Sequence, residues 1–596
     1  MYQIRLRALS TFLLLVPLAL ASDHGGVGSR AFVTGSWSLV QQGTTGVSAM
    51  QLVVVSETSA VILDKVEHNP LMVDGHIAWG AELNINTRTV RVLNPTSNTW
   101  CATGSFIGNG TLVSTGGNPI VITGANGLQA VRLFTPCSDE TCDILEDPTR
   151  IRLTSPRWYP SSARLSDGSI IIIGGSMIGG FINNASVNNP TYEFFPPKNI
   201  NGRCFNGLQI PMQFLQDTLN ANQFPIVEQL PDDTLFIAAN QQAMIFDWKT
   251  NTEVLRLPNI PNGVRVTSPF SAGSVLFPLT PENNYTPEVM ICGGSTISDT
   301  QASNTISAET PASAQCSRMV LTAKGIAAGW SVETMPVPRI MTDLILLPDG
   351  RVLIVNGAQT GVAGFVIPGV EVLHEVGNSF ADNPAFTPVI YDPSAAAGSR
   401  FSSGGIPAST IARMYHSTAT LTPNGTIMLA GSNPNTDFTE MNSTIKYPTE
   451  YRLEFLSPPY MSQARPAYTG LPVTVDYGSV FRLSITLPSE AKNVSVVLMD
   501  FGFATHGVHM DQRSVKLVSE LSPSKETITV TGPPTPALYS PGPAFLFVVA
   551  NGIPSFGHRT IIGTGASPPV DEGAIANMLN KTSDPSAEAS PSTWST

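Results

Sequence analysis

The sequence predicts an all-β protein, in which a seven-bladed, kelch-like β-propeller is followed by a C-terminal immunoglobulin-like β-sandwich. The composition is rich in turn residues and poor in charge, with 50 glycines, 48 prolines and 13% charged residues. A hairpin pattern repeats through the middle of the chain, and the last quarter follows a different pattern. The 596 residues are also enough for at least two domains.

The N-terminal segment predicts the compartment. Arg5 and Arg7 precede an apolar run (8–20), and small residues suited to signal peptidase lie just before Ser22. We therefore expect residues 1–21 to be a signal peptide and the protein to be secreted. No later run is long and apolar enough to span a membrane. In a secretory context the sequons can be glycosylated. They are Asn109, Asn184, Asn284, Asn424, Asn442, Asn493 and Asn580.

The acidic balance excludes several classes of protein. A formal charge of −12 and a pI near 5.2 leave no basic face for nucleic acid or anionic lipid. The hydrophobic content of 42% excludes general disorder. We expect neither nucleic acid nor a membrane as a partner.

Four segments carry the same hairpin pattern. In each, an Asn-Gly or Asp-Gly pair stands eight and nine residues after the opening residue, between runs of β-forming residues. This pattern is typical of a hairpin with a type I′-like turn. The four segments open at Cys101, Tyr159, Met341 and His416. Weaker copies at about 50–64, 225–239 and 269–294 complete a set of seven.

Hairpin units that recur at intervals of tens of residues match the blades of a propeller better than any helical repeat. A single blade cannot bury both of its faces, so the blades must close around an axis. Equivalent positions of different blades then meet at one pole, and the four opening residues should ring one central channel. We expect this domain to span 22–448, with a strand from the 22–46 stretch closing the ring.

The pattern changes after residue 448. Alternating apolar runs are separated by Pro- and Gly-containing turns, without the glycine pair that ends the blades, and this favours a sandwich over 449–565. The Ser/Thr/Pro-rich end at 566–596 predicts a disordered extension. The expected sandwich strands are Val480–Leu487, Val494–Met499, Ser514–Leu517, Thr527–Val530 and Ala544–Ala550.

Side chains able to hold a metal occur in the blade register and in one segment of the sandwich. Tyr415 adds a phenol next to His416, but neighbours on a regular strand point to opposite faces, so the two share a centre only if the chain bends. His506 and His509 would also face opposite ways, so only one of them should join a common site. Imidazole with phenolate oxygen suits Cu(II) better than Zn or Ca.

Four short phrases carry a family resemblance. They resemble the site motifs of the copper radical oxidases, most closely glyoxal oxidase and more distantly galactose oxidase. The resemblance covers about 35–569 and implies a galactose-oxidase-like early-set domain after the propeller. The phrases are WCATG (100–104), RWYPSS (157–162), ARMYHST (412–418) and GFATHGVHMDQR (502–513).

Carried over residue by residue, the resemblance implies one copper ion held by four side chains. Tyr415 would be the axial ligand, and His416, His506 and Tyr159 the equatorial ones. A thioether would join Tyr159 to Cys101 and form a protein-derived radical cofactor. His506 would arrive on a hairpin that the C-terminal domain inserts into the channel.

The implied chemistry explains why these residue types are needed. Oxidation of an alcohol-like carbon removes two electrons, and one copper centre stores only one of them. A sulfur-substituted phenol at Tyr159 can store the second as a radical. Tyr415 would take the proton of the substrate, and O2 would reoxidise the site and leave as H2O2. An aldehyde fits this scheme because its hydrate is a geminal diol.

The substrate class follows from departures from galactose oxidase. Met177 in GGSMIGG stands where that enzyme stacks a tryptophan over the radical, and no carbohydrate-binding domain fits before the propeller. The resemblance therefore implies small aldehydes, such as glyoxal and methylglyoxal, as substrates. It also implies that peroxide is passed to extracellular peroxidases. We expect the enzyme to be a monomer.

The cysteines agree in part with an oxidising compartment. Two pairs are expected to form disulfides, Cys137–Cys142 and Cys292–Cys316. With Cys101 assigned to the thioether, Cys204 is left over as a buried free thiol.

Two other functions stay open on the sequence. A secreted propeller without catalysis would bind glycan or protein, and a copper radical oxidase of different specificity would act on primary alcohols. A propeller that had lost catalysis would be expected to have lost one of the four ligands. None is substituted, which favours the enzyme.

Overall fold

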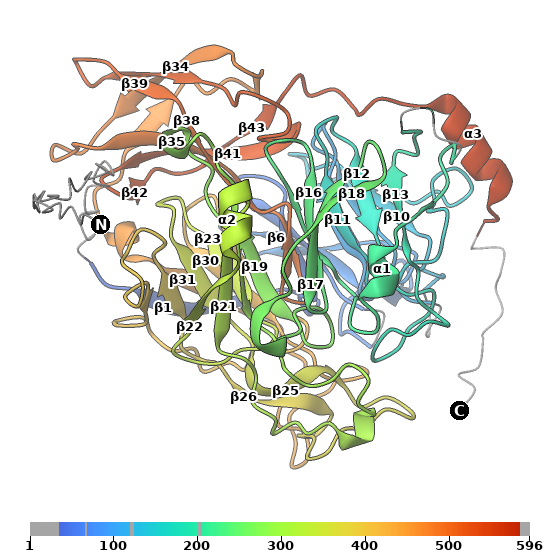
Figure 1. The fold of residues 1–596 in the computed structure, drawn as a ribbon. Coiled ribbons are helices and arrows are strands. Elements are labelled where there is room, and N and C mark those ends of the chain that lie inside the picture. The colour runs from blue at the N-terminus through green and yellow to red at the C-terminus, as the bar shows by residue number, and fades with distance from the viewer. Residues whose placement is uncertain (1–34, 66–67, 120–123, 201, 203–204, 585–596) are drawn as a thin grey trace, which may run out of the picture.

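The computed structural model describes residues 35–65, 68–119, 124–200, 202 and 205–584. Small antiparallel sheets stand around a common centre, and a second β-domain lies against one end of them (Figure 1). The all-β fold class is confirmed. The predicted signal peptide and Cys204 lie outside the described residues.

The sheets of the propeller are local units, because their strands follow one another along the chain. In chain order they are β2 (Gln51–Val54), β3 (Ser59–Leu63), β6 (Gly80–Asn84) and β7 (Val90–Leu93); β8 (Thr103–Phe106), β9 (Leu112–Thr115) and β10 (Val131–Phe134); β11 (Ser161–Arg164), β12 (Ile170–Ile173), β13 (Thr191–Phe195) and β14 (Ile210–Pro211); β15 (Ile226–Gln229), β16 (Leu235–Ala239), β17 (Gln242–Asp247) and β18 (Thr252–Arg256); β19 (Ala272–Leu276), β20 (Glu288–Gly293), β21 (Gln315–Val320) and β22 (Ser331–Thr334); β23 (Asp343–Leu346), β24 (Val352–Val355), β27 (Val389–Tyr391) and β28 (Phe401–Ser402); and β29 (Ser417–Leu421), β30 (Ile427–Gly431) and β31 (Arg452–Ser457).

One sheet is closed by the start of the chain. Strand β1 (Ser38–Thr44) pairs antiparallel with β31, with Ser38 opposite Ser457. The predicted closing strand is therefore confirmed. It joins the two ends of the propeller segment through main-chain hydrogen bonds.

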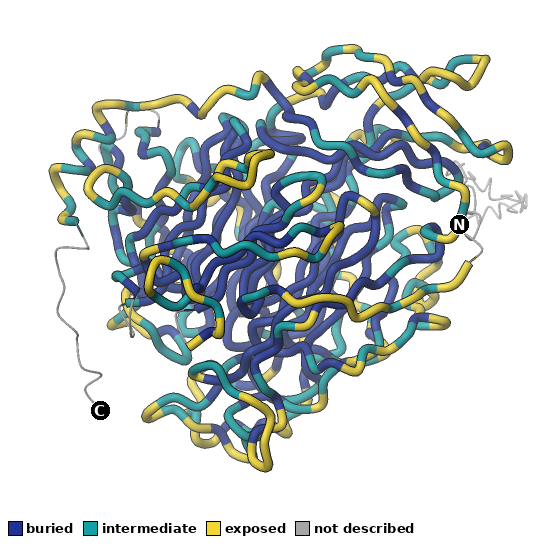
Figure 2. Tube along the Cα trace, turned by 180° about the vertical axis from the view of Figure 1, so that it is seen from behind, coloured by how far each residue is buried: buried dark blue, intermediate teal, exposed yellow. Residues whose placement is uncertain are grey.

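The first strands of neighbouring sheets meet around the centre: β2 contacts β29, β29 contacts β23, and β8 contacts β11. These strands are buried along their whole length. Figure 2 shows the consequence, a buried interior under an exposed outer surface. The starts of these strands therefore point to one enclosed region.

The repeated hairpins are present, but the turn type differs from the prediction. Each glycine of the Asx-Gly pair has a left-handed φ, whereas the Asn or Asp before it does not. Gly110 donates to the carbonyl of Ile107 (2.9 Å) and Asn109 Oδ1 accepts from the Thr111 N–H (2.9 Å). This is a type I turn followed by a left-handed glycine. The Asx side chain favours it because it satisfies the N–H two residues on.

The second β-domain consists of two sheets, antiparallel except for the parallel pair β33–β43, and lies above the propeller in Figure 1. All five strands expected from the alternating runs are found, with ends within a few residues of the prediction. One sheet contains β32 (Ala467–Thr469), β34 (Val480–Thr486), β39 (Ser519–Leu521) and β40 (Thr527–Thr531). The other contains β33 (Thr474–Val475), β35 (Val494–Asp500), β38 (Arg513–Leu517), β41 (Gly542–Ala550), β42 (Ile553–Pro554) and β43 (His558–Ile562).

A two-stranded insertion, β25 (Ala358–Phe365) and β26 (Ser379–Pro384), projects from the propeller on the side away from the sandwich (Figure 1). The insertion begins directly after β24, at the pole of the propeller where the first strand of each sheet starts. Further short elements are β4 (Met72–Val73), β5 (His76–Ile77), α1 (Phe214–Asp217), α2 (Ala323–Ala328), and the 3₁₀ turns Pro261–Gly263, Pro281–Asn283, Ser303–Thr305 and Pro459–Ser462.

The prediction of a disordered extension at 566–596 is wrong for the part of it that the structure describes. Helix α3 (Glu572–Lys581) follows the sandwich, and the Asp571 side chain caps it by accepting from the Ala574 N–H. At its other end, the Arg152 guanidinium donates to the carbonyls of Leu579 and Thr582. Capping at both ends and contact with the propeller order the helix. Composition alone could not reveal this contact.

Both predicted disulfides are present, Cys137–Cys142 and Cys292–Cys316. Cys292 and Cys316 stand directly opposite each other on β20 and β21, so the bond lies within one sheet. Asn109 is half-buried, and the other predicted sequons are exposed. In the described part of the chain, no helix has both the length and the apolar character to cross a membrane.

Candidate metal centre

The residues that open the four strong repeats share one backbone conformation. They lie one or two residues before the first strand of their sheet. A left-handed φ is rare in residues other than glycine and breaks the alternation of a strand. It supplies the bend that Tyr415 and His416 need in order to face one centre. The φ values are 59° at Cys101, 61° at Tyr159, 59° at Met341 and 61° at His416.

A hairpin from the sandwich segment fills the middle of the propeller. Strands β36 (Phe503–Thr505) and β37 (Val508–Met510) form it, and β36 pairs with β2. The tip consists of His506 and Gly507, with φ values of 52° and 81°. The hairpin thus carries His506 along the axis to the pole where the first strands begin, as the resemblance implied.

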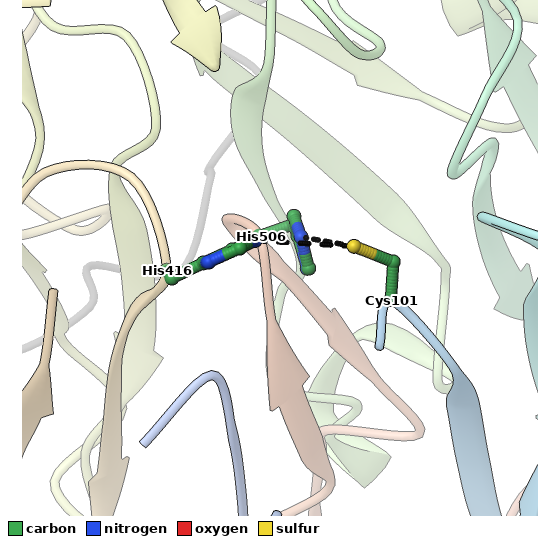
Figure 3. Close-up of side chains that lie close together, drawn as sticks. All are labelled: Cys101, His416 and His506. Atoms are coloured by element: carbon green, nitrogen blue, oxygen red, sulfur yellow. Dashed lines mark hydrogen bonds between the residues drawn. The ribbon is translucent and has the colours of Figure 1, made fainter. Parts of the chain in front are cut away.

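Three predicted side chains converge at this tip. The Nε2 atom of His506 lies 3.3 Å from the Sγ of Cys101, and the Nε2 of His416 lies 3.8 Å from the same sulfur (Figure 3). All three residues are buried, and their ligand atoms lie within 4.8 Å of one another. They come from separate parts of the chain, and the fold alone brings them together.

The two predicted phenols complete the cluster. The hydroxyls of Tyr159 and Tyr415 are in direct hydrogen-bond contact. The Tyr415 ring stacks on His416 with 3.9 Å between ring centroids, and the Tyr159 ring meets His506 edge-on at 4.8 Å. Both tyrosines are at least 94% buried, at 3% and 6% exposure. Two phenols, two imidazoles and one thiol therefore share one closed space.

Aromatic side chains surround this cluster. Trp158 and Phe224 pack on Tyr159 at centroid distances of 4.1 and 4.5 Å, and Phe365 lies 5.9 Å from Tyr415. None of these three side chains was predicted from the sequence as part of the site. Phe224 shares the left-handed φ of the register, at 49°, and directly precedes a weaker copy of the repeat. The position of Phe224 could therefore have been predicted from the repeat. Phe365 could not, because it lies in the β25–β26 insertion, which does not share the repeat pattern.

Met177, which the resemblance to galactose oxidase would place over a Tyr159 radical, is 39% exposed. His509 is buried on β37 but lies outside the group of converging ligand atoms.

Burial keeps the cluster neutral when no cation is present. It raises the pKa of both tyrosines well above their usual value and lowers the pKa of His506 to about 3. Neutral imidazoles offer lone pairs, and a nearby cation would favour the phenolates. The donor set and its electrostatics therefore fit a divalent metal ion.

Thr505 orients one of these lone pairs. Its hydroxyl donates to the carbonyl of Met50 (2.8 Å) and lies 2.6 Å from Nδ1 of His506. Because the hydroxyl proton of Thr505 is donated to the Met50 carbonyl, the hydroxyl oxygen accepts a hydrogen bond from the Nδ1–H of His506. This tautomer leaves the Nε2 lone pair facing the cluster.

Comparison with known proteins places the chain. Residues 64–460 match the family described as Glyoxal oxidase N-terminus, and residues 465–562 match the Galactose oxidase-like, Early set domain. The chain belongs to the glyoxal oxidase family. This family member is accordingly an oxidoreductase.

Relatives of this glyoxal oxidase family member agree with that assignment. The protein Aldehyde oxidase GLOX of Vitis pseudoreticulata is 32% identical over 88% of this chain and 96% of its own length. Aldehyde oxidase GLOX1 of Arabidopsis thaliana is 33% identical over 80% and 73%. Galactose oxidase of Gibberella zeae is 24% identical over 67% of this chain and 53% of its own.

A solved structure shares the fold. It is described as a novel fungal alcohol oxidase of the AA5 family in complex with copper. It superimposes with a TM-score of 0.65 at 18% identity, over 89% of this chain and 99% of that one. That structure contains copper, and what it shares with this glyoxal oxidase family member is the fold.

Proposed function

We propose that the protein is a secreted copper radical oxidase that converts small aldehydes, as their hydrates, into carboxylic acids. In this reaction the hydrate loses two electrons and two protons, and O2 gains them and becomes H2O2. The observation that carries the proposal is the buried convergence of Cys101, Tyr159, Tyr415, His416 and His506. The names of the plant relatives, both aldehyde oxidases, favour an aldehyde as substrate.

In this proposal Tyr159, Tyr415, His416 and His506 hold one copper ion. Cys101 forms a thioether with the ring of Tyr159, a step in which the S–H and one ring C–H lose their hydrogens to O2. Two observations support this pairing. The Tyr159 N–H donates to the carbonyl of Cys101 (3.2 Å), and Cys101 is the free cysteine of the described residues.

Copper, when bound, supplies a one-electron couple and a position for the oxygen of the substrate. The other roles belong to the chain. Tyr415, as its phenolate, accepts the proton of the hydrate, and Tyr159, in its one-electron-oxidised form, accepts the hydrogen atom from carbon on its phenolic oxygen. Trp158 and Phe224 cover the Tyr159 ring and keep water from it. The aromatic enclosure favours small substrates such as glyoxal and methylglyoxal.

The setting of the enzyme is proposed on separate grounds. The two disulfides support an oxidising compartment, in line with the signal peptide expected at residues 1–21. We propose a monomer that supplies H2O2 to extracellular peroxidases.

Purified protein loaded with copper provides the test. We expect one copper per chain, a radical-type optical band after mild oxidation, and H2O2 from methylglyoxal. Glycerol, benzyl alcohol and galactose, tested beside it, should be poorer substrates. Faster turnover of an alcohol would show that the substrate is a primary alcohol. If the protein took up no copper, it would be a propeller that binds glycan or protein without catalysis.

The thioether is tested without activity. Mass spectrometry of a digest should find the peptides of Cys101 and Tyr159 joined and two hydrogen atoms lighter. Cys101→Ala should remove the cross-link and nearly abolish turnover. Val254→Ala, at an exposed position of β18, should keep both. Full activity of Cys101→Ala would contradict the proposed mechanism.

A further inference from the structure

A lysine side chain lies deep inside the propeller, close to the proposed copper site. Lys65 follows β3, and its side chain has 0% exposure. A lysine is rarely buried in this way unless its charge has a partner. The mechanism proposed above does not use it.

The surroundings of Lys65 are those of an ammonium ion. Its Nζ donates to the carbonyl of Asn435. It also lies over two aromatic faces, 5.1 Å from the ring centroid of Trp100 and 4.6 Å from that of Phe365. A carbonyl oxygen and ring faces attract a cation, and the ammonium group is a donor without acceptor capacity.

These two rings connect the ammonium to the cluster. Trp100 is the residue before Cys101, and it stacks with Phe365 at a centroid distance of 5.9 Å. Phe365 lies 5.9 Å from the Tyr415 ring and 6.3 Å from the His416 ring. One aromatic layer therefore separates the lysine from the proposed ligands. Within so buried a region, charges act through a low effective dielectric.

We propose that Lys65 is a positioning residue that sets the redox poise of the site through its fixed positive charge. This inference rests on the proposed function. One-electron oxidation of a phenolate at Tyr159 gives a neutral radical and removes one negative charge. A nearby cation stabilises the phenolate, so it raises the reduction potential of the radical. The same cation repels a second positive charge and weakens the binding of Cu(II).

The test compares variants that keep or remove this charge. Lys65→Met and Lys65→Gln remove it, and the glutamine can still donate to the Asn435 carbonyl. Lys65→Arg keeps it. Lys198→Met is the matched control, because Lys198 also lies over two rings, Phe194 and Trp248, but in another part of the propeller. Its Nζ is paired with Asp167 at 2.6 Å.

Two measurements are made on the copper-loaded protein. Copper affinity is measured by competition with a chelator, and the radical is titrated optically at graded ratios of ferricyanide to ferrocyanide. For both neutral variants we expect about tenfold tighter copper binding. We also expect half-oxidation at a lower ratio of ferricyanide to ferrocyanide. Lys65→Arg and Lys198→Met should match the wild type.

The direction of the change in copper affinity distinguishes an effect of the Lys65 charge from an effect of its packing. If Lys65 were only structural, its loss would loosen the site and weaken copper binding. Unchanged or weaker affinity, or an unchanged oxidation ratio, in Lys65→Gln would therefore overturn the inference while leaving the proposed function intact. If the wild type bound no copper and gave no radical band, the proposed function would fail and this inference with it.

Discussion

The hydroxyl of Thr505 decides which nitrogen of His506 is available. It is committed to the Met50 carbonyl, so it accepts from Nδ1–H, and Nε2 is left to face Cys101 at 3.3 Å. Such hydrogen bonds commonly fix the tautomer and orientation of a metal-binding histidine. A residue with no direct access to a metal can thus control the metal site.

Thr505→Val tests this role. The substitution keeps the shape of the side chain and removes the hydroxyl, so Nδ1 loses its acceptor. We expect copper affinity to fall by roughly 10- to 100-fold, measured by calorimetric titration. Thr505→Ser should retain the affinity, because it keeps the hydroxyl. Wild-type affinity in the valine variant would contradict the assigned tautomer.

Trp158 packs closely on the ring of Tyr159, at a centroid distance of 4.1 Å. Met177, which the sequence comparison placed there, is 39% exposed. Trp158→Leu should shorten the lifetime of the oxidised optical band roughly 2- to 10-fold, because an aromatic contact and its shielding are lost. Met177→Ala should leave the lifetime unchanged. A long-lived band in Trp158→Leu together with a short-lived one in Met177→Ala would restore the sequence-based placement.

At the scale of elements, the β36–β37 hairpin is held by several sheets at once. Strand β36 pairs with β2. The Gln512 amide bonds the main chain of β23 on both sides, donating to the Leu344 carbonyl and accepting from the Leu346 N–H, each at 2.8 Å. Asp511 accepts from the Arg164 N–H at 2.8 Å. These contacts fix the depth at which His506 enters the propeller.

Gln512→Ala should release one of these anchors. Two buried main-chain groups of β23 would lose their partners, which costs about 2–4 kcal/mol of unfolding free energy. We expect a lower unfolding temperature and weaker copper binding, measured by calorimetry and metal titration. Gln301→Ala, at an exposed position, should change neither. A stable variant with normal copper affinity would show that the hairpin does not need this anchor.

The elements also show how far sequence patterns reach. The Asx-Gly pairs predict the hairpins and their register, because a left-handed glycine is a local requirement of the turn. The same pairs misled the assignment of the turn type, since the Asx residues keep a negative φ and cap the turn instead. Helix α3 was missed because its capping partner, Arg152, lies in the propeller.

At the scale of the whole molecule, buried carboxyl groups couple stability to pH. Burial raises the pKa of Asp343 on β23 to about 7. The folded protein therefore holds this proton to a higher pH than the unfolded chain does. Ionisation of Asp343 then costs stability as the pH rises from about 4 to about 7.

Asp343→Asn should remove this cost. The amide keeps an acceptor for the Asn356 side chain, which donates to Asp343 at 2.8 Å. We expect the variant to be more stable than the wild type by about 1–3 kcal/mol at pH 8 and nearly equal at pH 4, by denaturation at both pH values. Asp232→Asn, at an exposed position, should show no such difference. An advantage that does not grow with pH would contradict the raised pKa.

The sequence by itself determined the all-β fold class, the repeat, the closing strand, both disulfides and the register shared by Cys101, Tyr159 and His416. Each of these depends on local patterns, since a turn or an alternating strand needs only its neighbours along the chain. The tertiary structure alone decided which parts meet. Closure of the sheets around an axis brings Cys101 to His506, 405 residues away, and places the Lys65 charge behind the aromatic wall of the site. No local pattern encodes these contacts, because they arise from the geometry of ring closure and the depth of the inserted hairpin.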